Sequence, residues 1–239
     1  MGATFVGGLI RGFVGFGGAL VIILVTSVAL GPINAVPIAA LSGFPATLQL
    51  LPNAIRNAEG EFALPFGIAA FLSAPIGTVM LVAINASVMK IAISAFVLMM
   101  VAPMYFGWQP RYRFGARSLI LAGVGTGLVQ GAAGVGGPPA VTIALARPGS
   151  AEHQRANVIA AVTALALCAL APMWWHGLFT TQVIVISVCV VPVYSFATWL
   201  GARLFRLGYQ QHFRRASVLT LVVTGLSTLI IAVRDLLTF

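Results

Sequence analysis

Residues Gly8–Gly18 read GLIRGFVGFGG and lie inside an apolar run that is long enough to cross a membrane. A spanning helix is normally an unbroken series of leucine-like residues, but this stretch holds five glycines and Arg11. Glycine weakens a helix interior, and a charged side chain at bilayer depth is costly. The stretch is therefore predicted to be a broken helix with a function, not a plain membrane span.

The composition places the whole chain in a membrane. Of its 239 residues, 60% are hydrophobic and 7% are charged, and the mean hydropathy is +1.04, whereas soluble domains have about 25% charged residues. Apolar segments of spanning length recur from end to end, so we expect a single membrane domain over residues 1–239. No basic region precedes the first apolar run, which argues against a cleavable signal peptide. Basic loops that orient helices explain the net charge of +9, so nucleic acid is not expected as a partner.

The glycine pattern occurs twice. GLIRGFVGFGG from Gly8 recurs as GLVQGAAGVGG from Gly127, and all five glycines match at a shift of 119 residues. We interpret the chain as two homologous halves, near 1–110 and 118–239. Each half holds three plainer apolar segments and one glycine-interrupted segment, which divides into two arms of about 12 residues. The expected segments are 4–30, 34–52, 62–84 and 88–106 in the first half and 118–146, 156–174, 182–204 and 217–233 in the second.

The basic residues favour a re-entrant path for the two glycine segments. If all eight segments cross the membrane, the basic residues divide five against seven between its sides, which is no bias. If the glycine segments enter and leave on one side, ten basic residues lie on one side and only Lys90 and Arg234 on the other. The ten are Arg56, Arg111, Arg113, Arg117, Arg147, Arg155, Arg203, Arg206, Arg214 and Arg215.

This count predicts the fold class. Three spans per half is an odd number, so the second half is inverted relative to the first. We expect an all-α integral membrane protein of two inverted repeats, each with one re-entrant, broken helical hairpin and three transmembrane helices. The basic loops are then cytoplasmic and both termini periplasmic.

The two hairpin tips are the candidate binding site. Broken helices at membrane depth present free N–H groups and the positive end of a helix dipole, which attract anions. Arg11 lies beside the first tip, and Gln130 holds the matching place in the second half. The expected substrate-binding residues are Arg11, Gly15, Gly17, Gly18, Gln130, Gly134, Gly136, Gly137, Pro138, Gln49 and Asn53.

Structural alternatives stay open for several polar and small residues. Arg11 could instead extend to the membrane interface, and Gln49 and Asn53 could make interhelical hydrogen bonds. Arg155 and Asn157 open a predicted span and are expected to form a gate or, alternatively, a helix cap. The outer glycines of the repeated pattern fit close helix packing equally well. These glycines are Gly8, Gly12, Gly127 and Gly131.

Several functions are disfavoured by what the sequence lacks. It has no Walker A, HExxH or CxxC pattern, so neither ATP hydrolysis nor a metal site is expected. No Asp or Glu lies inside a predicted span, so the usual carboxylate proton relay is missing. Export of an anion from a negative-inside cell needs no such relay, because the membrane potential already drives it.

The duplicated GxxxGxxGxGG pattern resembles one family. Its second copy continues as GVGGPPAVTIALA and then EHQRAN, and in this the chain resembles the TauE/SafE sulfite exporter family of bacterial membrane permeases over essentially its whole length. The resemblance implies transport of sulfite, sulfonates or related small anions, often outward. It also implies no enzyme activity and no cofactor.

These observations together predict a secondary transporter, an exporter of small anions such as sulfite or organosulfonates, in the bacterial cell inner membrane. Its expected partners are the anionic substrate and the lipid bilayer, with a homodimer as a further option. Two alternatives remain: Na⁺- or H⁺-coupled uptake of a small organic or sulfur anion, and a non-transporting membrane partner subunit.

Overall fold

The computed structural model describes residues 1–30, 32–83, 115–133, 136–220 and 222–223, and all regular structure within these ranges is helical. The helices are α1 (Gly2–Val14), α2 (Gly18–Leu30), α3 (Pro32–Asn57), α4 (Gly60–Ala83), α6 (Ala116–Ala133), α7 (Gly137–Ala146), α8 (Ala151–Trp175), α9 (Thr181–Arg206) and the 3₁₀ turn η1 (Tyr209–His212). A further helical stretch covers 213–220. The all-α prediction is confirmed for these residues. The predicted span 88–106 and most of 217–233 lie outside them.

Four of the described helices are long and apolar enough to cross a membrane. Helices α3, α4, α8 and α9 contain 26, 24, 25 and 26 residues, or roughly 36–39 Å at about 1.5 Å per residue, against a hydrocarbon core of about 30 Å. Large apolar side chains cover their outer faces, such as Leu72 on α4 (68% exposed) and Val188 on α9 (65% exposed). Such surfaces are expected of an integral membrane protein.

The first glycine segment breaks and turns back. Helix α1 ends at Val14, and Gly15 and Gly17 have φ angles of +97° and +87°, which glycine adopts without a steric penalty. An added Cβ at Gly18 would lie 2.9 Å from Cβ of Arg11, and one at Gly7 would lie 3.1 Å from the carbonyl oxygen of Gly18. Helices α1 and α2, of 13 residues each, therefore lie antiparallel on either side of this break.

The second glycine segment also consists of two helices, but its arms differ in length. Helix α6 has 18 residues and α7 has 10, whereas the sequence predicted about 12 in each. Helix α7 opens with Pro138 and Pro139, where the missing N–H groups cost nothing because the first turn has no intrahelical partner for them. Residues 134–135, which include the predicted Gly134, lie outside the described ranges.

Glycines let α1 and α9 approach closely. An added Cβ at Gly12 would overlap the carbonyl oxygen of Thr198, and one at Gly8 would lie 2.6 Å from Cβ of Ala197. From the other side, an added Cβ at Gly201 would overlap the carbonyl oxygen of Leu9. For Gly8 and Gly12 the close-packing alternative therefore describes their contacts.

The pair of α4 and α6 repeats this arrangement. An added Cβ at Gly77 of α4 would overlap the carbonyl oxygen of Leu128, and one at Gly127 of α6 would overlap that of Ala70. Gly127 is thus a packing glycine, like its counterpart Gly8.

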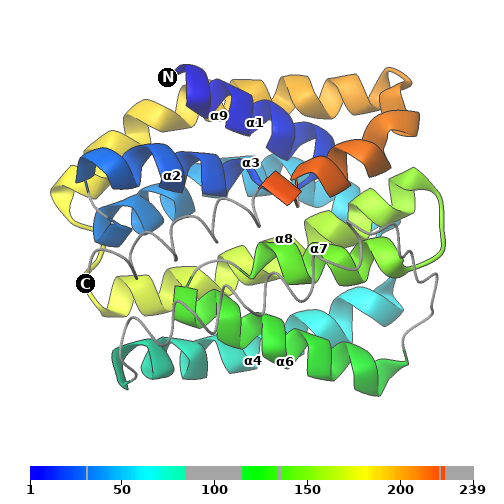
Figure 1. Ribbon diagram of the computed structural model, residues 1–239, viewed down its shortest axis with the longest axis horizontal. Helices are drawn as coiled ribbons and strands as arrows, with labels where there is room; N and C mark the ends of the chain where they lie inside the picture. The colour runs from blue at the N-terminus through cyan, green and yellow to red at the C-terminus, as the bar shows by residue number, and fades with distance from the viewer. Residues whose placement is uncertain (31, 84–114, 134–135, 221, 224–239) are drawn as a thin grey trace.

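The helices form a layered bundle. Figure 1 shows α1 and α9 along one edge and α4 and α6 along the opposite edge, with α2, α3, α7 and α8 between them. In the centre α3 packs against α8, while α3 also contacts α9 and α8 also contacts α4. The first helix of the N-terminal glycine segment, α1, packs on the long helix α9, and the first helix of the second glycine segment, α6, packs on the long helix α4.

Charge separates the two ends of the bundle. Every described arginine except Arg11 lies at the end where α3 and α9 finish and α6 and α8 begin, on the right of Figure 1. They are Arg56, Arg117, Arg147, Arg155, Arg203, Arg206, Arg214 and Arg215. Trp174 and Trp175, 76% and 87% exposed, lie at the opposite end, where α8 finishes.

Candidate functional site

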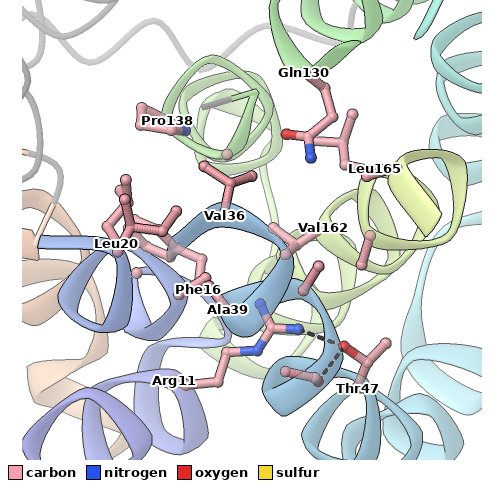
Figure 2. Close-up of a pocket in the computed structure, with 18 of the residues that line it drawn as sticks. Arg11, Phe16, Leu20, Val36, Ala39, Thr47, Gln130, Pro138, Val162 and Leu165 are labelled. Carbon is pink, nitrogen blue, oxygen red and sulfur yellow. Dashed lines mark hydrogen bonds between the residues drawn. The ribbon is translucent and has the colours of Figure 1, made fainter. Parts of the chain in front are cut away.

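A cavity of about 110 Å³ lies between the two hairpins and the central helices. One buried water needs about 10–15 Å³ of cavity volume, so the cavity has room for a molecule of a few non-hydrogen atoms. It extends along α8 from Val162 to Met173, towards the tryptophan end. Figure 2 shows side chains from α1, α3, α6, α7 and α8 converging on it. Of the predicted residues, those that line it are Arg11, Gly17, Gln130, Gly137 and Pro138.

Arg11 is the one charged side chain among the described residues that line this cavity. It comes from the last turn of α1 and is 5% exposed, so it does not extend to the interface. Its Nη2 donates a 2.8 Å hydrogen bond to Oγ1 of Thr47 on α3 (Figure 2). Its Nε is buried and finds no hydrogen-bond acceptor among the described residues. A buried donor without an acceptor costs free energy unless a further group, such as a ligand, accepts its hydrogen bond.

Tyr194 on α9 is a cavity residue that the sequence analysis missed. It is fully buried, it lines the same cavity, and its hydroxyl has no hydrogen-bond partner within the described part of the chain. An added Cβ at Gly18 would overlap this hydroxyl, so the glycine makes room for it. The available signal was a lone phenol within the apolar run 182–204, because a buried tyrosine usually bonds its hydroxyl.

Gln130 connects the second hairpin tip to the cavity. Its Oε1 accepts a 3.0 Å hydrogen bond from the backbone N–H of Gly136, so this tip amide is already satisfied. The side-chain nitrogen is then left as the group that faces the cavity, as Figure 2 shows. A ligand in the cavity could therefore accept a hydrogen bond from Nε2 of Gln130, whereas the backbone N–H of Gly136 already donates to Oε1 of Gln130.

Three other predicted tip glycines, Gly15, Gly18 and Gly136, contact residues near the cavity without lining it. Gly15 lies against Ile159 of α8, with an added Cβ only 2.9 Å from Cγ1 of that residue. Gly18 leaves space for the Tyr194 hydroxyl, and Gly136 is the donor to Gln130. None of the three lines the cavity itself.

Most of the remaining wall is apolar. Phe16, Leu20, Ile23, Val162 and Leu165 surround the polar groups. Such surroundings lower the local dielectric and strengthen interactions with the arginine charge. A positive, donor-rich pocket in apolar walls favours a small anion over a cation.

The predicted Gln49 and Asn53 lie elsewhere. They line a second cavity of about 350 Å³ at the arginine-rich end, together with Arg155. Gln49 is two residues and Asn53 six residues beyond Thr47 on α3, and neither lines the central cavity with Arg11.

Arg155 caps the first hairpin. Its Nε donates to the carbonyl oxygen of Phe13 at 2.9 Å and its Nη2 donates to that of Gly12 at 2.5 Å. These carbonyls belong to the last turn of α1, where they have no intrahelical partner, and a cation there also complements the helix dipole. The guanidinium lies 4.4 Å from the centre of the Phe205 ring. Arg155 thus caps the end of α1, whereas the N-cap of its own helix α8 is Ser150.

Asn157 belongs to a network between two loops. Its Oδ1 accepts the backbone N–H of Glu59 at 2.9 Å, and its Nδ2 donates to the Glu59 carboxylate at 3.2 Å. The same carboxylate pairs with Arg147, whose Nε lies 2.8 Å away. The network joins the α3–α4 connection to the α7–α8 connection.

An all-helical bundle with four described membrane-length helices and a small, mainly apolar internal cavity is typical of an integral membrane protein. The family described as sulfite exporter TauE/SafE matches residues 1–228, and the chain belongs to this family. Its members are membrane transporters, so the protein is a transporter and not an enzyme. No curated protein and no solved structure matches the chain.

Proposed function

We propose that the protein is a secondary transporter that exports small oxyanions, sulfite or small organosulfonates, by alternating access around the central cavity. One observation carries the proposal: Arg11 and Tyr194 both line the central cavity, and the Nε of the one and the hydroxyl of the other are buried donors that have no partner in the described structure. Two idle donors, one of them charged, fit a ligand that brings negatively charged acceptor oxygens.

The size and shape of the cavity support the substrate class. Space for a few non-hydrogen atoms suits an oxyanion or a short sulfonate. The anion's oxygens would accept from Arg11, Tyr194 and the side-chain nitrogen of Gln130. Thr47 holds the Arg11 guanidinium in place through their hydrogen bond.

Alternating access is supported by the way the helices pair. We infer two inverted repeats, 1–110 and 118–239, because α1 packs on α9 as α6 packs on α4. An added Cβ at Gly201 would meet the Leu9 carbonyl, and one at Gly77 would meet the Leu128 carbonyl. The two leucines are 119 positions apart and the two glycines 124, so corresponding residues of the two halves make both contacts. Repeats of this kind let one structural unit rock against the other around a fixed site.

The charge distribution supports the orientation and direction. We place the arginine-rich end in the cytoplasm of a bacterial cell and the tryptophan end on the periplasmic side. An anion leaving such a cell gains about 2.3 kcal/mol per charge per 100 mV. Among the described residues, no carboxylate lines the central cavity, which supports uncoupled export over proton- or sodium-coupled uptake.

The test is radiolabelled sulfite flux in proteoliposomes that contain the purified chain. We expect flux that reverses or accelerates with an imposed potassium diffusion potential and needs no sodium or proton gradient. Flux that depends on either gradient would support coupled uptake instead. Folded protein that moves no sulfite or small sulfonate at any voltage would refute the proposal and favour a non-transporting partner subunit.

A further inference from the structure

The second cavity has the composition of an anion site. It lies at the arginine-rich end, where α3, α8 and α9 meet, and its volume is about 350 Å³. Of the residues that the structure describes, Arg56, Arg155 and Arg206 line it, together with one carboxylate, that of Glu152. Asn53 also lines it with an Oδ1 that is buried and accepts no hydrogen bond from the described residues, so a water or a protonated anion oxygen can donate to it.

Only a thin layer separates this cavity from the central one. On α3, Thr47 lines the central cavity and Asn53 lines the second, six residues or about 9 Å further along the helix. On α8, Val162 and Arg155 mark the same two levels. Between these levels lie Leu50 of α3 and Ile159 of α8, which belong to one small apolar cluster, here called the apolar layer; Leu50 also forms part of the wall of the second cavity.

Arg155 belongs to both the second cavity and the first hairpin. It lines the cavity, yet its donors are occupied by the Gly12 and Phe13 carbonyls at the end of α1. That end leads directly to Gly15, which rests on Ile159 of the apolar layer. The guanidinium thus holds the tip of the hairpin against the layer that closes the central cavity on this side.

We infer that the second cavity is an entry site for the transported class of anion, and that Arg155 is exchanged there between the α1 carbonyls and the anion. A helix end carries roughly half a negative charge, whereas an oxyanion carries at least a full one, so a bound anion competes for the arginine. Once Arg155 turns to the anion, α1 loses its cap, and Gly15 is free to leave Ile159. The identity of the anion rests on the proposed function; the site and the exchange rest on the geometry.

The binding test counts sites. Equilibrium dialysis of radiolabelled sulfite with the purified full chain in detergent is expected to give two sulfites per chain. Arg56→Gln with Arg206→Gln should remove one of them, and Arg206→Gln alone should weaken that site by up to about fivefold, the upper end of the range for an exposed charge pair. The control is Arg203→Gln, which lies on the same helix, stacks on Trp199 and lines neither cavity, and it should keep both sites.

The outcomes separate this inference from the proposed function. One sulfite per chain, lost in Arg11→Gln but retained in the double variant, would overturn the entry site and leave the central site standing. One sulfite lost in the double variant but unaffected by Arg11→Gln would support the entry site and refute the central one.

The exchange is tested by the accessibility of the layer. Ile159→Cys, in a chain with Cys168→Ala and Cys189→Ala, is labelled with a water-soluble maleimide in methanesulfonate or in gluconate at equal ionic strength; methanesulfonate represents the small sulfonates because sulfite itself reacts with maleimides. Methanesulfonate is expected to raise the labelling rate severalfold, and Arg56→Gln with Arg206→Gln should abolish that rise. Equal rates with methanesulfonate and gluconate in the chain that keeps Arg56 and Arg206 would overturn the exchange.

Discussion

Replacing Tyr194 by phenylalanine should move stability and anion affinity in opposite directions. The substitution removes one hydroxyl from a fully buried side chain and leaves the ring in place. In the empty protein this hydroxyl has no partner among the described residues, so its burial costs free energy, about 1–3 kcal/mol for a neutral group. Phenylalanine should therefore leave the unfolding temperature unchanged or raise it.

With anion bound, the same hydroxyl donates to a charged acceptor. Such hydrogen bonds contribute about 1.5–3 kcal/mol, which corresponds to about a 10- to 150-fold loss of affinity. The assay combines sulfite dialysis with thermal unfolding in detergent, with and without sulfite. Tyr209→Phe is the matched control, because Tyr209 is 53% exposed on η1 and lines neither cavity. A lower unfolding temperature with unchanged sulfite affinity in Tyr194→Phe would refute the reasoning and make the hydroxyl structural.

Three further substitutions test the site and the packing. Arg11→Gln should weaken sulfite affinity by at least about tenfold, because a hydrogen bond from a charged group is lost. The folded yield should change little, because a buried charge without a counter-ion is itself unfavourable. A collapsed yield with normal residual affinity would contradict this. Gln130→Glu keeps the acceptor for Gly136 but faces the anion with a carboxylate, so affinity should fall in dialysis at neutral pH; unchanged affinity would place Gln130 outside the site. Gly201→Ala should lower the free energy of unfolding by about 1–3 kcal/mol, because the added methyl group overpacks α9 against α1. Gly60→Ala is the control and should not lower it, because open space surrounds Gly60. Equal stability of the two variants would show that α1 and α9 do not pack this closely.

Local chemistry made part of the site predictable. The break near Gly15 and Gly17 follows from residues that favour positive φ, and the structure places both there. The repeat pattern pairs Arg11 with Gln130, and both line one cavity. These inferences needed only the local sequence and its duplication, because a helix break is decided mainly by the residues at the break.

Other parts depend on how distant helices face each other. Asn53 was expected beside the tips, but the level of a residue along α3 relative to the hairpins is set by packing, and it lies in the second cavity. Arg155 reaches carbonyls 142 and 143 positions away in the chain. The residue pattern within α1 or within α8 does not predict such a contact, because it depends on how the two helices pack.

The sequence by itself determined the membrane environment, the two glycine breaks and the duplication, because composition and backbone preference act locally and leave a direct mark on the residue order. Only the tertiary structure decided that Tyr194 joins Arg11, that Arg155 caps α1, and that an apolar layer divides two cavities. The physical reason is that a cavity exists where side chains from several helices fail to fill space together, and that property belongs to no single segment.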